Sequence, residues 1–164
     1  MSDSASNPVP REPGLAEAYL GLDPVSVCRR LVAVLGDAAH GWRVGAEQIA
    51  DPELTERMRE IARRREVFAV ELSNVVSGRS GQVVDEHTAT GRILTWWLEI
   101  RALTAHDKTA AVLKVCRRGS RSLLGEYEQA LDTALPEPIR AIVVRQFDDI
   151  AATAGWLDAL GAED

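Results

Sequence analysis

The chain has 164 residues, of which 46% are hydrophobic, 27% charged and 5% aromatic, and its formal net charge is −6. This length suits one domain that can bury a sizeable apolar core without disulfide or metal staples. The negative charge argues against general binding to nucleic acid or to an anionic membrane, because both need a basic protein surface.

Residues 1–20 are rich in Ser, Pro and Gly, and this composition predicts a flexible tail before a single helical domain over residues 21–162. Tyr19, Leu20 and Leu22 are the apolar residues that could attach the end of the tail to that domain. The first residues have no hydrophobic signal core, and no apolar run approaches the roughly 20 residues of a membrane span. We therefore expect a cytoplasmic protein.

Two Asp-Pro pairs predict the starts of the first two long helices. Asp23-Pro24 and Asp51-Pro52 each place an N-cap before a proline at the first helical position, where no N–H is needed. Apolar residues then recur every three or four positions, so they share one face of each helix. The first stripe comprises Cys28, Leu31, Leu35, Ala38, Trp42, Gly45 and Ile49, and the second Leu54, Met58, Ile61, Arg65, Phe68, Leu72 and Val75. Their short connection predicts antiparallel neighbours.

Glycines interrupt the first of these helices. Gly36, Gly41 and Gly45 lower its intrinsic helix propensity by up to about 1 kcal/mol each relative to Ala. We interpret them as positions of close packing around Trp42.

Residues 79–106 are predicted to join this hairpin to a second one through a loop and a shorter helix, from Asp85 to about Leu103. A new N-cap at Asp107 starts a helix that continues to Leu135, and Pro136-Glu-Pro138 separates it from the last helix. Two helical hairpins with a long connection are typical of ferritin-like proteins. The sequence therefore predicts an all-α, ferritin-like four-helix bundle.

A series of short motifs follows in a definite order along the chain. They are Asp51-Pro-Glu-Leu, Arg65-x-x-Phe68-Ala-x-Glu71-Leu72, Gly91, Trp97, Cys116-x-x-Gly119, Tyr127-x-x-Ala130-Leu131 and Leu135-Pro136. Together they resemble an uncharacterised bacterial family of ferritin-like four-helix-bundle proteins, over about residues 26–160. The resemblance implies a bundle with a crossing helical connection and a stress or storage association, without an established reaction. The chain departs from the family at Leu94, where relatives often have His, and at Ser120, where they often have Glu.

Metal chemistry is the first activity to test against such a bundle. A ferritin-like di-iron site needs one Glu from each of two helices and a Glu-x-x-His pair from each of the other two. The chain contains no Glu-x-x-His, and its histidines, His40, His87 and His106, do not share a pattern that would bring them together. We expect no cofactor. The alternative is an atypical site for iron or another divalent metal among Glu47, Glu66, Glu71 and Glu126.

Other catalytic signatures are also missing from the sequence. Cys28 and Cys116 lie within helical stripes without Cys-x-x-Cys spacing, which is typical of buried apolar residues. No Ser or Cys occurs in a recognised nucleophile motif, and there is no phosphate loop, dinucleotide fingerprint or calcium loop. We predict no catalytic residue and no enzyme activity.

Four polar residues interrupt the apolar stripes, namely Arg65, Ser120, Gln146 and Thr153. A buried polar group without a partner costs about 1–3 kcal/mol, so each should find one. Thr153 can bond to a carbonyl of its own preceding turn. The first three are candidates for buried polar positions or ligand anchors. For Arg65, we weigh a structural pair with Glu71, Glu126 or Asp149 against an anchor for an anion or ligand.

Trp96 and Trp97 are about 100° apart around a helix, so both cannot face the same core unless the helix is covered on two sides. They predict a homodimer or protein-partner interface on the connecting helix, and the alternative is a tail that folds over the second Trp.

Two groups of basic residues are interpreted as solvated helix faces rather than as a nucleic-acid site, since Glu53, Glu56 and Glu60 interleave the first group. These groups are Arg57, Arg59, Arg63 and Arg64, and Lys114, Arg117, Arg118 and Arg121.

The sequence therefore predicts a ferritin-like bundle that acts as a non-catalytic binding or assembly module, with a stress-related role implied by the resemblance. The competing class is a metal-binding protein or oxidoreductase with an atypical carboxylate site.

Overall fold

The computed structural model describes residues 14–80, 96–104 and 106–162, and these segments are mostly helical. In chain order the helices are α1 (Leu15–Tyr19), α2 (Pro24–Glu47), α3 (Pro52–Ser80), α4 (Trp96–Arg101), α5 (Lys108–Leu131) and α6 (Glu137–Ala162). No strand occurs in these segments, which confirms the all-α prediction. None of the described helices is long and apolar enough to cross a membrane.

Three of the long helices, α2, α3 and α5, begin where the sequence predicts, because an aspartate caps each of these starts. Asp23 Oδ1 accepts a hydrogen bond from the Ser26 N–H at 2.9 Å. Asp51 Oδ1 accepts from the N–H groups of Glu53 and Leu54 at 2.9 and 3.1 Å, and Asp107 Oδ1 accepts from Ala110 N–H at 3.0 Å. These bonds satisfy N–H groups that have no partner within a helix.

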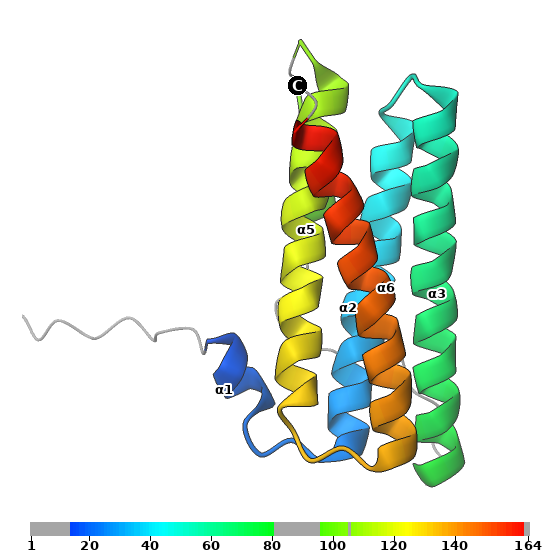
Figure 1. Cartoon of the computed structure of the whole chain (residues 1–164), viewed down its shortest axis with the longest axis vertical. Coiled ribbons are helices and arrows are strands. Elements are labelled where there is room, and N and C mark those ends of the chain that lie inside the picture. Colours follow the sequence, from blue (N-terminus) through cyan, green and yellow to red (C-terminus); the bar gives the residue numbers. More distant parts are fainter. Residues whose placement is uncertain (1–13, 81–95, 105, 163–164) are drawn as a thin grey trace, which may run out of the picture.

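The four long helices, α2, α3, α5 and α6, lie side by side (Figure 1). α2 packs against α3 and α5, and α6 packs against α5 and α3. α2 and α6 run in one direction, and α3 and α5 run in the other (Figure 1). The last residues of α3 therefore lie at one end of the bundle, and α4 and the first residues of α5 lie at the other end. With 24 to 29 residues each, the helices are about 36 to 44 Å long.

Two predicted boundaries need correction, and a third lies outside the described residues. Residues 15–19, assigned to a flexible tail over 1–20, form α1, because the Tyr19 side chain is 2% exposed and anchors this short helix, while Leu20 is 82% exposed. Residues 1–13 lie outside the described part of the chain. The connecting helix, expected over 85–103, is described only as α4, since 81–95 also lie outside that part.

The second correction concerns the end of α5, which the sequence places at Leu135. The helix ends at Leu131 instead. Its last carbonyl groups accept hydrogen bonds from outside the helix: Thr133 Oγ1 donates to Ala130 O at 2.6 Å, and Arg140 Nη2 donates to Leu131 O at 2.8 Å. These bonds replace the partners that a longer helix would have supplied.

Two apolar clusters fill the bundle, one toward each end. The first gathers around Leu31, Leu72, Leu123, Tyr127 and Val143, and the second around Trp42, Met58, Ile100, Val112 and Leu157. Gly45 allows close packing in the second cluster, since a Cβ there would lie 2.8 Å from Met58 Cε and 3.3 Å from Val112 Cγ1. Gly36 does not, because a Cβ there would meet nothing within 4 Å. The close-packing interpretation is therefore right for Gly45 and wrong for Gly36.

Candidate functional site

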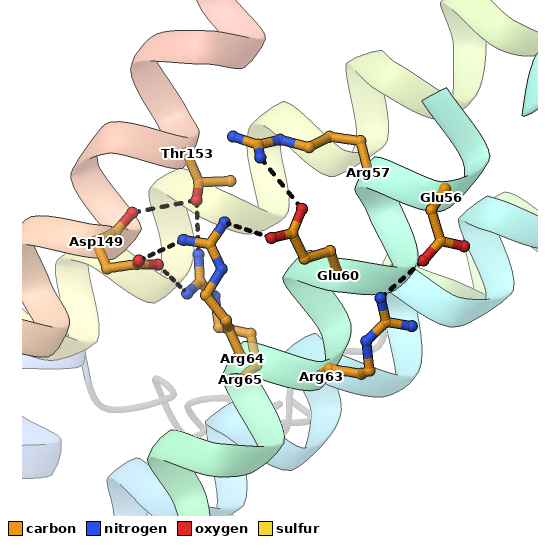
Figure 2. A network of polar contacts seen from close by, with 8 residues as sticks. All are labelled: Glu56, Arg57, Glu60, Arg63, Arg64, Arg65, Asp149 and Thr153. Carbon is orange, nitrogen blue, oxygen red and sulfur yellow. Dashed lines mark hydrogen bonds and ion pairs between the residues drawn. The ribbon is translucent and has the colours of Figure 1, made fainter. Parts of the chain in front are cut away.

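The polar residues that interrupt α3 and α6 meet in the middle of the bundle, between the two apolar clusters. Arg64, Arg65, Asp149 and Thr153 form what we term the central polar cluster (Figure 2). Arg65 donates from Nη1 to Asp149 Oδ1 at 2.7 Å and from Nη2 to Thr153 Oγ1 at 2.9 Å. Arg64 Nη1 donates to the other oxygen, Asp149 Oδ2, at 2.6 Å. One carboxylate therefore holds two guanidinium groups and joins α3 to α6.

Burial makes a charged partner necessary for Arg65. The Arg65 side chain is 1% exposed, and its guanidinium carbon lies 5.5 Å from the centre of the Phe68 ring. Burial lowers the pKa of Arg65, although the hydrogen bond and charge of Asp149 oppose the shift. Burial would raise the pKa of Asp149, but hydrogen bonds and charge from Arg65 and Arg64 outweigh it and hold that pKa below its usual value. Both partners stay charged near neutral pH, as a stable buried pair requires.

Of the three carboxylates considered for Arg65, only Asp149 is its partner. Thr153 also donates to Asp149 O of its own preceding turn at 3.1 Å, as the sequence predicts for a Thr within a helix. Ser120, the α5 position at this level, is buried as well. The centre of the bundle is thus held by a cationic side chain with one acid and one hydroxyl.

Gln146 forms a second buried polar contact, one helical turn further along. Its side chain is fully buried, accepts a hydrogen bond from Tyr127 Oη at 2.7 Å, and donates from Nε2 to Glu71 Oε2 at 2.9 Å and to Phe68 O at 3.3 Å. Glu71 is also bonded by Arg145 at the surface. Burial raises the pKa of the Tyr127 phenol, which therefore remains a hydrogen-bond donor. Gln146 connects α3, α5 and α6, and its partners occupy both ends of its amide.

Glu126 has partners that the sequence alone does not identify. It is 4% exposed and accepts from Tyr19 Oη at 2.5 Å and from Arg30 Nε and Nη2 at 2.8 and 2.9 Å. The Arg30 guanidinium lies over the Tyr19 ring at 5.2 Å. Burial and the neighbouring Glu126 raise the pKa of Tyr19. One feature of the sequence could have indicated this contact. Glu126 follows Leu123 by three residues and therefore shares the buried face of α5, where a carboxylate needs a partner.

The four carboxylates considered for an atypical metal site do not come together. Glu47 is exposed near the end of α2, and Glu66 is an exposed residue of α3 that pairs with Arg43. Glu71 and Glu126 are bound by the side chains described above. In residues 14–80, 96–104 and 106–162, no three His, Cys, Asp or Glu side chains are grouped so that they could hold a metal ion.

Trp96 and Trp97 are the first two residues of α4, but their side chains lie outside the described part of the structure. Ile100 of the same helix is fully buried in the second apolar cluster. Arg118 of α5 pairs with Glu99 of α4. These contacts fix α4 against the end of the bundle where α5 begins.

A surface groove separates the first half of α3 from the last half of α6, next to the central polar cluster. It has a volume of about 640 Å³, and we term it the acidic groove. It is lined by Asp51, Glu53, Leu54, Glu56, Arg57, Glu60, Trp156 and Leu160. Arg57 lies over the Trp156 ring at 5.6 Å and pairs with Glu60 at 3.2 Å.

The groove exists because the end of α6 is held against α5 rather than α3. Arg117 Nη2 of α5 donates to Leu157 O at 2.8 Å, and Asp158 pairs with Arg117 at 3.3 Å and with Arg121 at 3.0 Å. Figure 1 shows the last turns of α6 close to α5 and apart from α3. The sequence pattern did not identify this groove, since Leu54 was assigned to the apolar stripe of its helix and Glu53, Glu56 and Glu60 to a solvated face.

The fold and these contacts define an all-helical protein in which Arg65, Gln146 and Glu126 are buried and bonded to polar side chains of other helices. Residues 23–133 match the family described as Domain of unknown function (DUF2383), and since the match covers more than half of the chain, the chain belongs to that family. The matched region extends from the start of α2 past the end of α5 and stops before α6. No curated protein matches the sequence.

Proposed function

We propose that this protein is a ferritin-like bundle that works as a non-catalytic binding or assembly module. The observation that carries the proposal is Arg65 at the middle of the bundle, bonded to Asp149 and Thr153. A ferritin-like di-iron protein gathers carboxylates and imidazoles in the bundle core, where they bind cations. A buried guanidinium repels a metal ion placed beside it and already neutralises the nearby acid.

The ferritin-like layout is supported by the directions of the four long helices. α2 and α6 run opposite to α3 and α5, and α3 ends at the far end of the bundle from α4 and α5 (Figure 1). A bundle with one long crossover connection has this order of directions, whereas short loops throughout would make each helix antiparallel to the next.

The acidic groove is the surface that we assign to binding. It is a concave surface of about 640 Å³ between two helices. It combines apolar side chains from two helices with charged groups, and a site of this kind can select a partner by shape and charge. A stress-related role in a bacterium is the physiological setting that the sequence resemblance suggests, and we propose that the protein acts in the cytoplasm.

Metal analysis of the full-length protein tests the non-catalytic proposal. The protein is purified from iron-, manganese- and zinc-supplemented cultures without chelators, and bound metal is measured by mass spectrometry. We expect far less than one metal ion per chain and no dioxygen consumption on addition of Fe²⁺. Stoichiometric metal that is lost in Glu71→Ala or Glu126→Ala would favour the atypical carboxylate site and overturn the proposal.

We also propose that the connecting helix, with Trp96 and Trp97, contributes a homodimer or partner interface. Sedimentation velocity over a hundredfold range of protein concentration measures the association state directly. A dimer that dissociates in Trp97→Ala supports this interface, and a monomer at every concentration argues against the homodimer.

A further inference from the structure

We propose that the acidic groove docks a basic amphipathic helix from a partner protein. This inference rests on the proposed binding function and names the class of its partner. Apolar residues of the incoming helix would contact Leu54, Trp156 and Leu160, and its Arg or Lys residues would face the acids along α3. The argument depends on the charge of the groove, a guanidinium already held there, and the spacing of its lining residues.

The charge of the lining is strongly one-sided, with four carboxylates against one guanidinium. Asp51 is engaged as the cap of α3, and Glu53 makes no ion pair among the described residues. Glu56 and Glu60 pair with arginines of their own helix, but their side chains are 61% and 49% exposed. Exposed pairs of this kind contribute only about 0–1 kcal/mol, so a partner's arginine can exchange with them at little cost.

Arg57 shows which chemistry the groove accepts. Its guanidinium lies over the Trp156 ring at 5.6 Å, while its Nη1 atom lies 3.2 Å from Glu60 Oε2 (the pair with Glu60 is drawn in Figure 2). An aromatic face with a carboxylate beside it is a favourable site for a planar cation. A partner's guanidinium therefore has the chemistry that this lining binds.

The spacing of the lining residues favours a helix over an extended peptide. The acids from Asp51 to Glu60 extend about 13.5 Å along α3, at 1.5 Å for each residue. Glu53, Glu56 and Glu60 follow one another by three and four positions and form one stripe, and Trp156 and Leu160 are four apart on α6. A helix laid between these stripes would present basic residues three and four positions apart on one side and apolar residues on the other.

The test uses the full-length protein and three fluorescein-labelled peptides of about four helical turns each. All three carry the same leucine stripe, and the flanking positions are Arg in the first, Gln in the second and Glu in the third. Binding is measured by fluorescence anisotropy at low and at physiological salt. We expect the Arg peptide to bind, the Gln peptide to bind at least tenfold more weakly, and the Glu peptide not to bind.

Two charge-reversal variants locate the binding site. Glu53 lies in the groove and makes no ion pair among the described residues that a substitution would break. Glu53→Arg should therefore weaken binding of the Arg peptide about tenfold, which corresponds to about 1.4 kcal/mol. Glu128→Arg makes the same change in charge on an exposed position of α5 and should leave the affinity unchanged. Equal weakening by both variants would mean nonspecific attraction to a negative protein and would overturn the assignment.

The remaining outcomes separate this inference from the function on which it rests. Equal binding of all three peptides, or preference for the Glu peptide, overturns the basic partner but leaves a binding groove. Failure of every peptide overturns the docking site, while the metal content of the same preparation independently decides whether the protein is non-catalytic.

Discussion

The two faces of α3 show how one helix can be used in opposite ways. Toward α2 it packs closely over its length, because Gly45 admits Met58 and because small and apolar residues such as Ala38, Ala62 and Ala69 are buried along α2 and α3. Toward α6 its contacts are fewer and polar, through Arg65 with Asp149 and Glu71 with Gln146, and they give way to the acidic groove. Apolar contacts hold α2 and α3 together, whereas directional polar contacts position α6 and leave the acidic groove between α3 and α6.

Removing Asp149 should break the α3–α6 contact with the largest effect. Asp149→Ala leaves the Arg65 guanidinium 99% buried without its acid, and we expect it to lower the free energy of unfolding by about 3–5 kcal/mol. Arg65→Met should cost less, because Asp149 is 24% exposed and keeps Arg64 as a partner. Urea unfolding followed by circular dichroism measures both variants.

The order of these two variants distinguishes a structural arginine from a ligand anchor. If Arg65→Met is as stable as the wild type or more so, and the protein also loses a bound ligand, Arg65 serves binding rather than the fold. If Arg65→Met costs more than Asp149→Ala, the asymmetry in burial is not what governs the pair.

Filling the space at Gly45 should disrupt the α2–α3 contact. Gly45→Leu places a side chain against Met58 and Val112 and is expected to destabilise the fold by about 1–3 kcal/mol. Gly36→Ala is the matched control on the same helix, where the space is open and a gain of about 0.5–1 kcal/mol is expected from helix propensity. Thermal melts of both variants check the contrast, and destabilisation by Gly36→Ala would contradict it.

Two tyrosine-to-phenylalanine variants compare the buried hydrogen bonds. Tyr127→Phe leaves Gln146 Oε1 buried without its donor and should cost about 1–2 kcal/mol. Tyr19→Phe should cost less than about 1 kcal/mol, because Glu126 keeps two bonds from Arg30. Chemical denaturation of both variants is the measurement, and a larger loss in Tyr19→Phe would mean that α1 stabilises the bundle more than its single phenol contact indicates.

The smallest expected effect is a pH dependence from α2. One oxygen of Asp37 is buried without a hydrogen-bond partner, and burial raises the pKa of this carboxyl to about 6. Its value in the unfolded chain is about 4, so the ionised group destabilises the fold above pH about 6, and the penalty disappears as the pH falls toward about 4. Asp37→Asn should therefore raise the melting temperature at pH 7.5, with a gain that shrinks toward pH 4.

Gly36→Ala provides the neighbouring control for this pH dependence, since it changes no titratable group and its effect should be the same at every pH. A constant effect of Asp37→Asn between pH 4 and pH 7.5 would show that the burial of Asp37 does not govern its titration.

Local sequence patterns were sufficient to predict the long helices, but they were less sufficient to predict where the helices end. The starts at Pro24, Pro52 and Lys108 follow from aspartate caps, which act within three residues. The end of α5 was misplaced because its carbonyl partners include Arg140, nine residues beyond Leu131. α1 was missed because a five-residue helix has little stability of its own and depends on Tyr19 reaching Glu126, 107 residues away.

The sequence by itself determined an all-helical chain, the starts of α2, α3 and α5, and four of the buried polar positions, Arg65, Ser120, Gln146 and Thr153, because capping and apolar periodicity operate over a few residues. Only the tertiary structure decided that Arg65 pairs with Asp149, 84 residues away, that Tyr19 and Arg30 share Glu126, and that α6 leans toward α5 and leaves the acidic groove. These features depend on the register between helices, which is set by the packing of all four together.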